Sequence, residues 1–127
     1  MTDVVNGSFR AGHPILTFLV RGTNQQIARI EAMIDTGFND YLTLPSWVIE
    51  KLQLLFVEEN QYFLADGTEG TAKVFEAEVE WFGSWRKTLV TQVDQNVLVG
   101  TALMQGCKLV VEVIDGGRVE LSRLNIS

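Results

Sequence analysis

The residues of this chain whose types and spacing could carry chemistry are Asp35-Thr36-Gly37, which follow the apolar segment 32–34. We expect Asp35 at the end of a strand, where the chain begins to turn. A carboxylate can take a proton from a water molecule when a second, protonated carboxyl group lies beside it. The tripeptide alone is weak evidence, since Asp and Gly are also common in ordinary turns. The neighbouring sequence must therefore show whether the tripeptide is catalytic or an ordinary turn after a strand.

Two further segments accompany the tripeptide in a specific order. Residues 41–45 form a strand-like run that ends at a proline before a short predicted helix, and residues 97–107 contain apolar residues and a Gly before a second potential helical turn. Together, over residues 14–114, these segments resemble the retropepsin-like aspartic peptidases, in particular the cellular prokaryotic branch. The resemblance implies an all-β fold, a closed acid-protease barrel of a single lobe with one or two short helices. It also implies an aspartic endopeptidase, a hydrolase of peptide or protein substrates.

Catalysis of this kind requires two carboxylates facing one water molecule. Carboxyl groups about 3 Å apart cannot both ionise and share a proton. The chain has one Asp-Thr-Gly, because Asp66 and Asp115 lie in predicted hairpin turns of a different sequence. The second carboxylate must come from another copy, so we expect a homodimer in which each subunit contributes Asp35 across a two-fold axis. No cofactor and no metal are expected.

The resemblance assigns roles to the neighbours of Asp35. The Thr36 hydroxyl is expected to bond across the axis to the partner loop, and Gly37 to keep the loop tight so that its amide reaches a carboxylate. Substrate contacts are expected at the following residues: Phe38, Asn39, Asp66 and Gly67.

Three positions depart from the retroviral pattern. Retroviral members usually have a small residue after Asp-Thr-Gly, and then an Asp that pairs with an Arg after the Gly of the second segment. Here the corresponding residues are Phe38, Asn39 and Thr101. Acid and base are missing together, so no buried charge is left unpaired. The departures concern substrate preference more than catalysis, and Phe38 is expected to narrow the cleft.

The elements that must position these residues are mostly strands. In 71–81, apolar residues alternate with Glu76, Glu78 and Glu80, which is typical of a strand with one buried face. The predicted helices are 45–52, with Val48, Ile49 and Leu52 at helical spacing, and 101–105, closed by Gly106. The predicted strands are 14–20, 26–34, 41–44, 61–64, 71–81, 85–93, 97–99, 108–114 and 118–124.

Two segments are expected to complete the enzyme. Residues 65–70 lie where the family carries its flap, although an ordinary hairpin loop would have the same composition. The terminal segments are expected to form part of the dimer interface. The last strand, 118–124, would otherwise be an open edge that invites partners.

Composition limits the function classes. The 127 residues are 46% hydrophobic and 20% charged, which fits a single globular domain over residues 1–127. The net charge of −6, with no cluster of Lys or Arg, argues against nucleic acid and against anionic membranes as partners. No signal peptide or membrane span is visible. The single cysteine, Cys107, favours a reducing compartment, so a cytoplasmic location is expected.

Other interpretations remain open at this stage. The same fold can serve as a dimerisation or peptide-binding module with little or no turnover, since fold does not fix function. A structural β-domain with an accidental Asp-Thr-Gly is a third interpretation. Nucleophilic chemistry by Cys107 and His13 is disfavoured, because Cys107 opens an apolar strand and His13 precedes a proline near a terminus. One His and one Cys are also too few for a zinc site.

Overall fold

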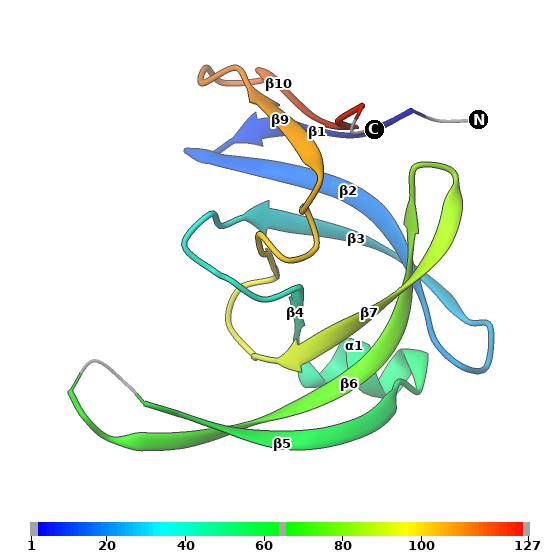
Figure 1. Ribbon diagram of the computed structural model, residues 1–127, viewed down its shortest axis with the longest axis vertical. Coiled ribbons are helices and arrows are strands. Elements are labelled where there is room, and N and C mark those ends of the chain that lie inside the picture. The colour runs from blue at the N-terminus through cyan, green and yellow to red at the C-terminus, as the bar shows by residue number, and fades with distance from the viewer. Residues whose placement is uncertain (1–2, 64–65, 126–127) are drawn as a thin grey trace.

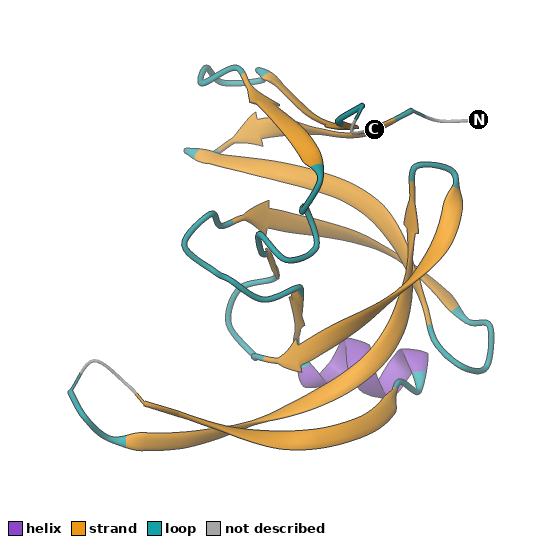
Figure 2. Ribbon diagram, in the orientation of Figure 1, coloured by secondary structure: helices purple, strands orange, loops and turns teal. Residues whose placement is uncertain are grey.

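A computed structural model describes residues 3–63 and 66–125. In these ranges one ten-stranded sheet and one short helix make up the regular structure (Figures 1 and 2). The elements are β1 Val4–Arg10, β2 His13–Arg21, β3 Ile27–Ile34, β4 Leu42–Leu44, α1 Ser46–Leu52, β5 Leu55–Phe63, β6 Glu69–Trp81, β7 Ser84–Gln92, β8 Leu98–Val99, β9 Cys107–Val111 and β10 Arg118–Arg123.

The sheet closes on itself to form a barrel. Its strand order is β5-β6-β7-β4-β8-β3-β2-β1-β10-β9, and β6 also pairs with β2, where Val20 lies opposite Val79. The strands from β6 to β2 therefore form a closed ring, with β5 extending it on one side and β1, β10 and β9 on the other. The expected all-β closed barrel is confirmed.

The barrel interior is filled by the apolar side of each strand. In β6, Ala77, Val79 and Trp81 are buried while Glu80 is exposed, as the alternating pattern predicted. Trp81 packs edge-on against Phe18 of β2, with ring centroids 5.5 Å apart. The largest fully buried side chains are Leu16, Leu42, Leu44, Leu52, Leu103, Leu121, Val20, Val79, Val90, Val99 and Val119.

Helix α1 agrees with its prediction. Pro45 occupies the N-cap position, and the helix buries Val48, Ile49 and Leu52 against the barrel. It ends at Gln53, whose N–H donates to the Glu50 carbonyl oxygen at 3.1 Å. The left-handed backbone of Gln53 then brings the N–H of Leu54 to the Ile49 carbonyl oxygen, also at 3.1 Å.

The second predicted helix, over residues 101–105, is wrong, because this segment is a run of turns. The N–H groups of Thr101 and Ala102 donate to carbonyl oxygens of the loop after β3. This pairing ties the segment to that loop. Gly106 does reverse the chain, with a φ of 81°.

Strand β1 was not predicted, and β5 was predicted only at its end, by the strand over 61–64. Gly7 interrupts the alternation of β1, and it is required there because a Cβ atom would lie 1.6 Å from the carbonyl oxygen of Ile15. In β5, Glu58-Glu59-Asn60 has no apolar alternation to mark a strand. The predicted flap turn, 65–70, is also shorter than expected, since β6 already begins at Glu69. Residue 64 of the predicted strand over 61–64 and residue 65 of the predicted flap lie outside the described residues.

The expectation of an open edge at 118–124 is wrong. Strand β10 pairs with β1 on one side and β9 on the other. The outermost strands in the sheet order are instead β5 and β9.

Candidate active site

Asp35 follows β3, at the point where that strand meets two short strands, β4 and β8. Strand β8 lies between β3 and β4, parallel to β3 and antiparallel to β4. The chain leaves β3 at Ile34 and enters β4 at Leu42, so residues 35–41 must pass over the end of β8 (Figure 1). We call residues 35–41 the Asp35 loop.

The segment after β8 holds the Asp35 loop from behind. The N–H of Asp35 donates to the Val99 carbonyl oxygen at 3.0 Å, and the N–H of Gly100 donates to the Tyr41 carbonyl oxygen at 2.9 Å. Between these two bonds, the N–H of Thr101 donates to the Phe38 carbonyl oxygen at 2.9 Å. Both ends and the middle of the loop are thus fixed to residues 99–101.

The carboxylate of Asp35 has a defined orientation. Its Oδ1 accepts the N–H of Gly37 at 2.9 Å. A Cβ atom at position 37 would lie 3.3 Å from the same oxygen, so a larger residue would crowd the carboxylate. Asp35 is half-buried, while Thr36 and Gly37 are exposed. The arrangement presents a hydrogen-bonded carboxylate at the surface of the chain, next to an available hydroxyl.

A groove of about 930 Å³ runs beside the Asp35 loop. Phe38 and Asp40 line it from the loop, Tyr62 from β5, and Gln92 and Asp94 from the end of β7 and the residues after it. The long β5–β6 hairpin thus forms one wall and the Asp35 loop another. Asp35, Thr36 and Gly37 do not line this groove, so an extended peptide laid in it would meet the Asp35 loop at Phe38 and Asp40.

The predicted substrate contacts are only partly brought together. Phe38 is half-buried in the groove wall, whereas Asn39, Asp66 and Gly67 are exposed and are not among the groove-lining residues. Contact of these three with substrate stays a prediction. Sequence reasoning missed Asp40, although its place in the Asp35 loop was a usable signal. Tyr62 and Asp94 had no signal of this kind, because only the fold brings them to the groove.

Asp66 has a local role in the hairpin turn. Its Oδ1 accepts the hydroxyl of Thr68 at 2.7 Å and the N–H of the same residue at 2.9 Å. These two bonds, the hydroxyl first, lower the pKa of Asp66 below the usual aspartate value. The carboxylate therefore stabilises its own turn.

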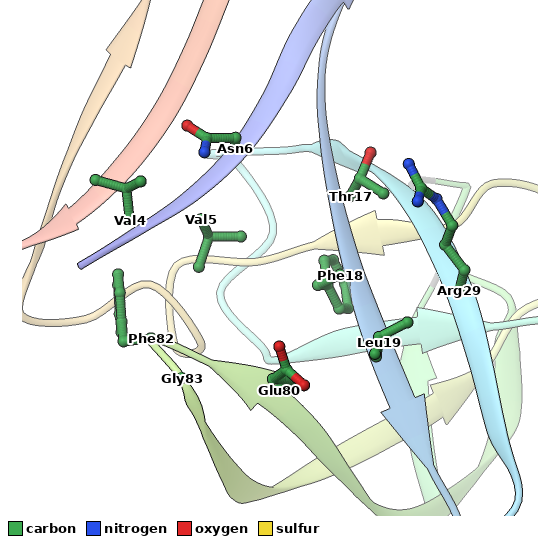
Figure 3. Close-up of a pocket in the computed structure, with 10 residues that line it drawn as sticks. All are labelled: Val4, Val5, Asn6, Thr17, Phe18, Leu19, Arg29, Glu80, Phe82 and Gly83. Atoms are coloured by element: carbon green, nitrogen blue, oxygen red, sulfur yellow. The ribbon is translucent and has the colours of Figure 1, made fainter. Parts of the chain in front are cut away.

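A second cavity, of about 420 Å³, lies between β1, β2 and the β6–β7 turn (Figure 3). Val5, Phe18 and Phe82 supply apolar lining, and Glu80 and Arg29 supply charge. None of its lining residues belongs to the Asp35 loop. This cavity is separate from the candidate site.

The remaining reactive side chains do not form a site with Asp35. Burial raises the pKa of the half-buried Cys107 thiol, against a smaller opposite effect of Arg86 and Arg123, and His13 is exposed at the start of β2. Within residues 3–63 and 66–125, His, Cys, Asp and Glu side chains form no group of three that could hold a metal ion. No helix in the described part of the chain is long and apolar enough to cross a membrane.

A closed β-barrel with an Asp-Thr-Gly loop braced by a short crossing strand has the retropepsin-like fold. A similar solved structure is that of the EIAV protease complexed with the inhibitor HBY-793, at a TM-score of 0.55 and 19% sequence identity. The alignment covers 80% of this chain and 95% of that one. No family model and no curated protein matches the sequence. At this identity the similarity establishes the fold, and function must be argued from the site.

Proposed function

We propose that residues 1–127 form a single aspartic endopeptidase domain, and that two copies of it make one active enzyme. Asp35 of both copies then activates one water molecule. The main support is the Asp35 carboxylate itself, held by the Gly37 N–H at 2.9 Å on a loop that is braced from behind and open to a partner. The sequence supplies a single Asp-Thr-Gly, which is half of what the chemistry needs.

The proposed reaction uses the two carboxyl groups in different protonation states. Two aspartates held about 3 Å apart share one proton and titrate as a coupled pair. The ionised member takes a proton from the water, whose oxygen attacks the peptide carbonyl carbon, while the protonated member donates to the carbonyl oxygen. Collapse of the tetrahedral intermediate breaks the C–N bond as the leaving nitrogen receives a proton. No cofactor takes part.

The remaining residues of the loop have supporting roles in this proposal. Thr36 is exposed, so its hydroxyl is available to bond to the partner loop and brace the pair. The substrate peptide lies in the 930 Å³ groove, where Phe38 reduces the width next to the scissile bond. The β5–β6 hairpin acts as the flap, with Asp66 and Gly67 near its tip, and closes over the peptide.

The finer placement in the cellular prokaryotic branch rests on position 101. The Thr101 N–H and hydroxyl both approach the Phe38 carbonyl oxygen, at 2.9 and 3.4 Å. A neutral contact thus joins the two segments that an ion pair joins in retroviral members. The single cysteine favours the cytoplasm as the compartment.

The decisive experiment incubates the purified protein and an Asp35→Asn variant with a diverse peptide library at several pH values, with products identified by mass spectrometry. Cleavage by the wild type and none by a folded, dimeric variant supports the proposal. Equal cleavage by both would assign the activity to another site or to a contaminant. No cleavage by either at any pH, with the dimer present, would favour a peptide-binding or dimerisation module on the same fold.

A further inference from the structure

Val113 and Ile114 form an exposed apolar tip on the turn between β9 and β10. They are 70% and 68% exposed, the two highest values among the large apolar residues that the structure describes. Exposure of a single aliphatic side chain is ordinary. Two adjacent ones on a turn form an apolar surface whose burial is favourable. We call Val113 and Ile114 the apolar tip.

The turn that carries the apolar tip is closed by hydrogen bonds at its base. The N–H of Glu112 donates to the Arg118 carbonyl oxygen at 2.8 Å, and the Glu112 carboxylate accepts the N–H of Arg118 at 2.9 Å. The N–H of Gly117 also donates to the Ile114 carbonyl oxygen at 2.8 Å. These bonds hold the backbone of the turn, so burial of the tip would cost little backbone conformational entropy.

Strand register places the apolar tip at the same ends of the strands as Asp35. Phe9 of β1 exchanges two backbone hydrogen bonds of 2.9 Å with Gly116 and Gly117, just after the tip. Phe9 lies opposite Pro14 of β2. Because Ile15 lies opposite Met33, Pro14 reaches the level of the end of β3, immediately before Asp35.

The distance between the apolar tip and the end of β3 is short. Neighbouring strands lie about 4.8 Å apart, so the three steps from the β9–β10 turn to β3 span about 15 Å. Figure 1 shows the β9–β10 turn, the β1–β2 turn and the loop between β3 and β4 on the same side of the molecule. An axis that brings two Asp35 loops together therefore also brings the two apolar tips toward the partner copy.

We propose that the apolar tip packs against a second copy of this chain and forms part of the interface that assembles the Asp35 pair. The inference rests on the proposed function, because only an incomplete carboxylate pair requires the second copy. It differs from a dimer built by shared terminal strands. Strands β1 and β10 already have partners on both sides within one chain, which leaves them little free backbone to share with another copy.

The test measures dimer affinity separately from catalysis. Sedimentation equilibrium of the wild type, of a Val113→Ser/Ile114→Ser double variant and of Ile114→Ser gives the dimer dissociation constant of each. We expect the double variant to weaken the dimer at least roughly a hundredfold, because each copy loses two buried aliphatic side chains. Both residues are mostly exposed, so the folded subunit should keep its circular dichroism spectrum.

Ile27→Ser is the matched control. Ile27 is 52% exposed and begins β3, at the opposite end of that strand from Asp35. The same substitution there should change the dissociation constant by less than about twofold. Peptide cleavage by the double variant should be lost at low protein concentration and recover at high concentration, which a defect in the catalytic groups would not produce.

The outcomes separate the two proposals. A double variant that dimerises as tightly as the wild type would overturn the role of the apolar tip, and Asp35-dependent cleavage would still support the peptidase. An equal loss of affinity in Ile27→Ser would also overturn it, since the effect would not depend on position. A monomeric wild type would overturn the apolar tip interface and, if it cleaved nothing, the proposed function as well.

Discussion

Gly100 lies so close to the Asp35 loop that a Cβ atom there would be 2.1 Å from the carbonyl oxygen of Asp40. Two atoms of Phe38, its Cδ2 and its carbonyl oxygen, would lie at 2.6 and 2.7 Å from the same position. The chain leaving β8 thus passes directly behind the Asp35 loop, so close that only glycine fits at position 100. This contact is what allows the hydrogen bonds from residues 99–101 to hold Asp35.

Gly100→Ala should therefore lower both stability and activity. We expect the free energy of unfolding to fall by at least about 3 kcal/mol, because backbone atoms rather than a flexible side chain would have to move. Urea unfolding at fixed protein concentration measures the change. Gly106→Ala is the control, since nothing lies within 4 Å of its added Cβ and only its φ of 81° opposes alanine, at a cost of about 1 kcal/mol. Equal losses in the two variants would contradict the close packing at Gly100.

The hydroxyl of Thr43 connects β4 to the segment that enters β8. It donates to the Asn96 carbonyl oxygen and accepts the N–H of Leu98, both at 2.8 Å, and Thr43 is buried. Thr43→Val keeps the shape but leaves both backbone groups without a partner, so we expect a loss of about 3 kcal/mol in the free energy of unfolding. Thr88→Val is the comparison, because that buried hydroxyl makes one bond of 3.2 Å, and we expect it to cost about 1 kcal/mol. If Thr43→Val cost no more than Thr88→Val, the bridging role would be wrong.

Local patterns were sufficient to predict most of the barrel. Strands with regular alternation, such as β6, and helix α1 with its leading Pro45 carry their signal within a few residues. Strand β1 carries no such signal, because it is fixed by pairing with β2 and β10 and contains Gly7 where the strands approach closely. Tertiary pairing decides such segments, and a single sequence does not display it.

Some residues of the candidate site could likewise be predicted from the sequence, and others could not. Asp35, Thr36 and Gly37 are adjacent in sequence, so their types and order could be recognised. Tyr62 and Asp94 reach the groove from the β5–β6 hairpin and from the residues after β7, which the chain brings together only on folding. The bonds of Thr101 and Ala102 to the Asp35 loop were equally hidden, because only the fold brings the two segments together.

The pKa of Asp66 should lie below the usual aspartate value and should depend on Thr68. Because the folded-state pKa is lowered, the turn gains stability from the ionised carboxylate above the unfolded pKa and loses it as pH falls through the folded pKa. NMR titration of the Asp66 carboxyl carbon measures this pKa. In Thr68→Val the hydroxyl donor is lost and the N–H is kept, so the pKa should rise part of the way toward the ordinary value. An unchanged pKa in Thr68→Val would rule out the hydroxyl as its main cause.

Cys107 should be a slow nucleophile and should not be needed for peptide cleavage. Burial raises the pKa of its thiol, so the thiolate fraction near neutral pH is below that of a free cysteine. A cysteine peptidase needs the opposite shift, produced by a neighbouring histidine. Cys107 lies opposite Arg123 at the end of β10, whereas His13 lies opposite Arg10 at the far end of β1.

Because Val4 lies opposite Ser122, Cys107 and His13 are about seven residues of strand apart, roughly 23 Å at 3.3 Å per residue. We therefore expect the thiol to react with a disulfide reagent more slowly than free cysteine at neutral pH, with a rate that rises further into the alkaline range. Cys107→Ser should cleave peptides at the wild-type rate, while Asp35→Asn should not cleave them. Loss of cleavage in a folded Cys107→Ser variant, together with fast thiol labelling, would transfer the chemistry from the carboxylate pair to the cysteine.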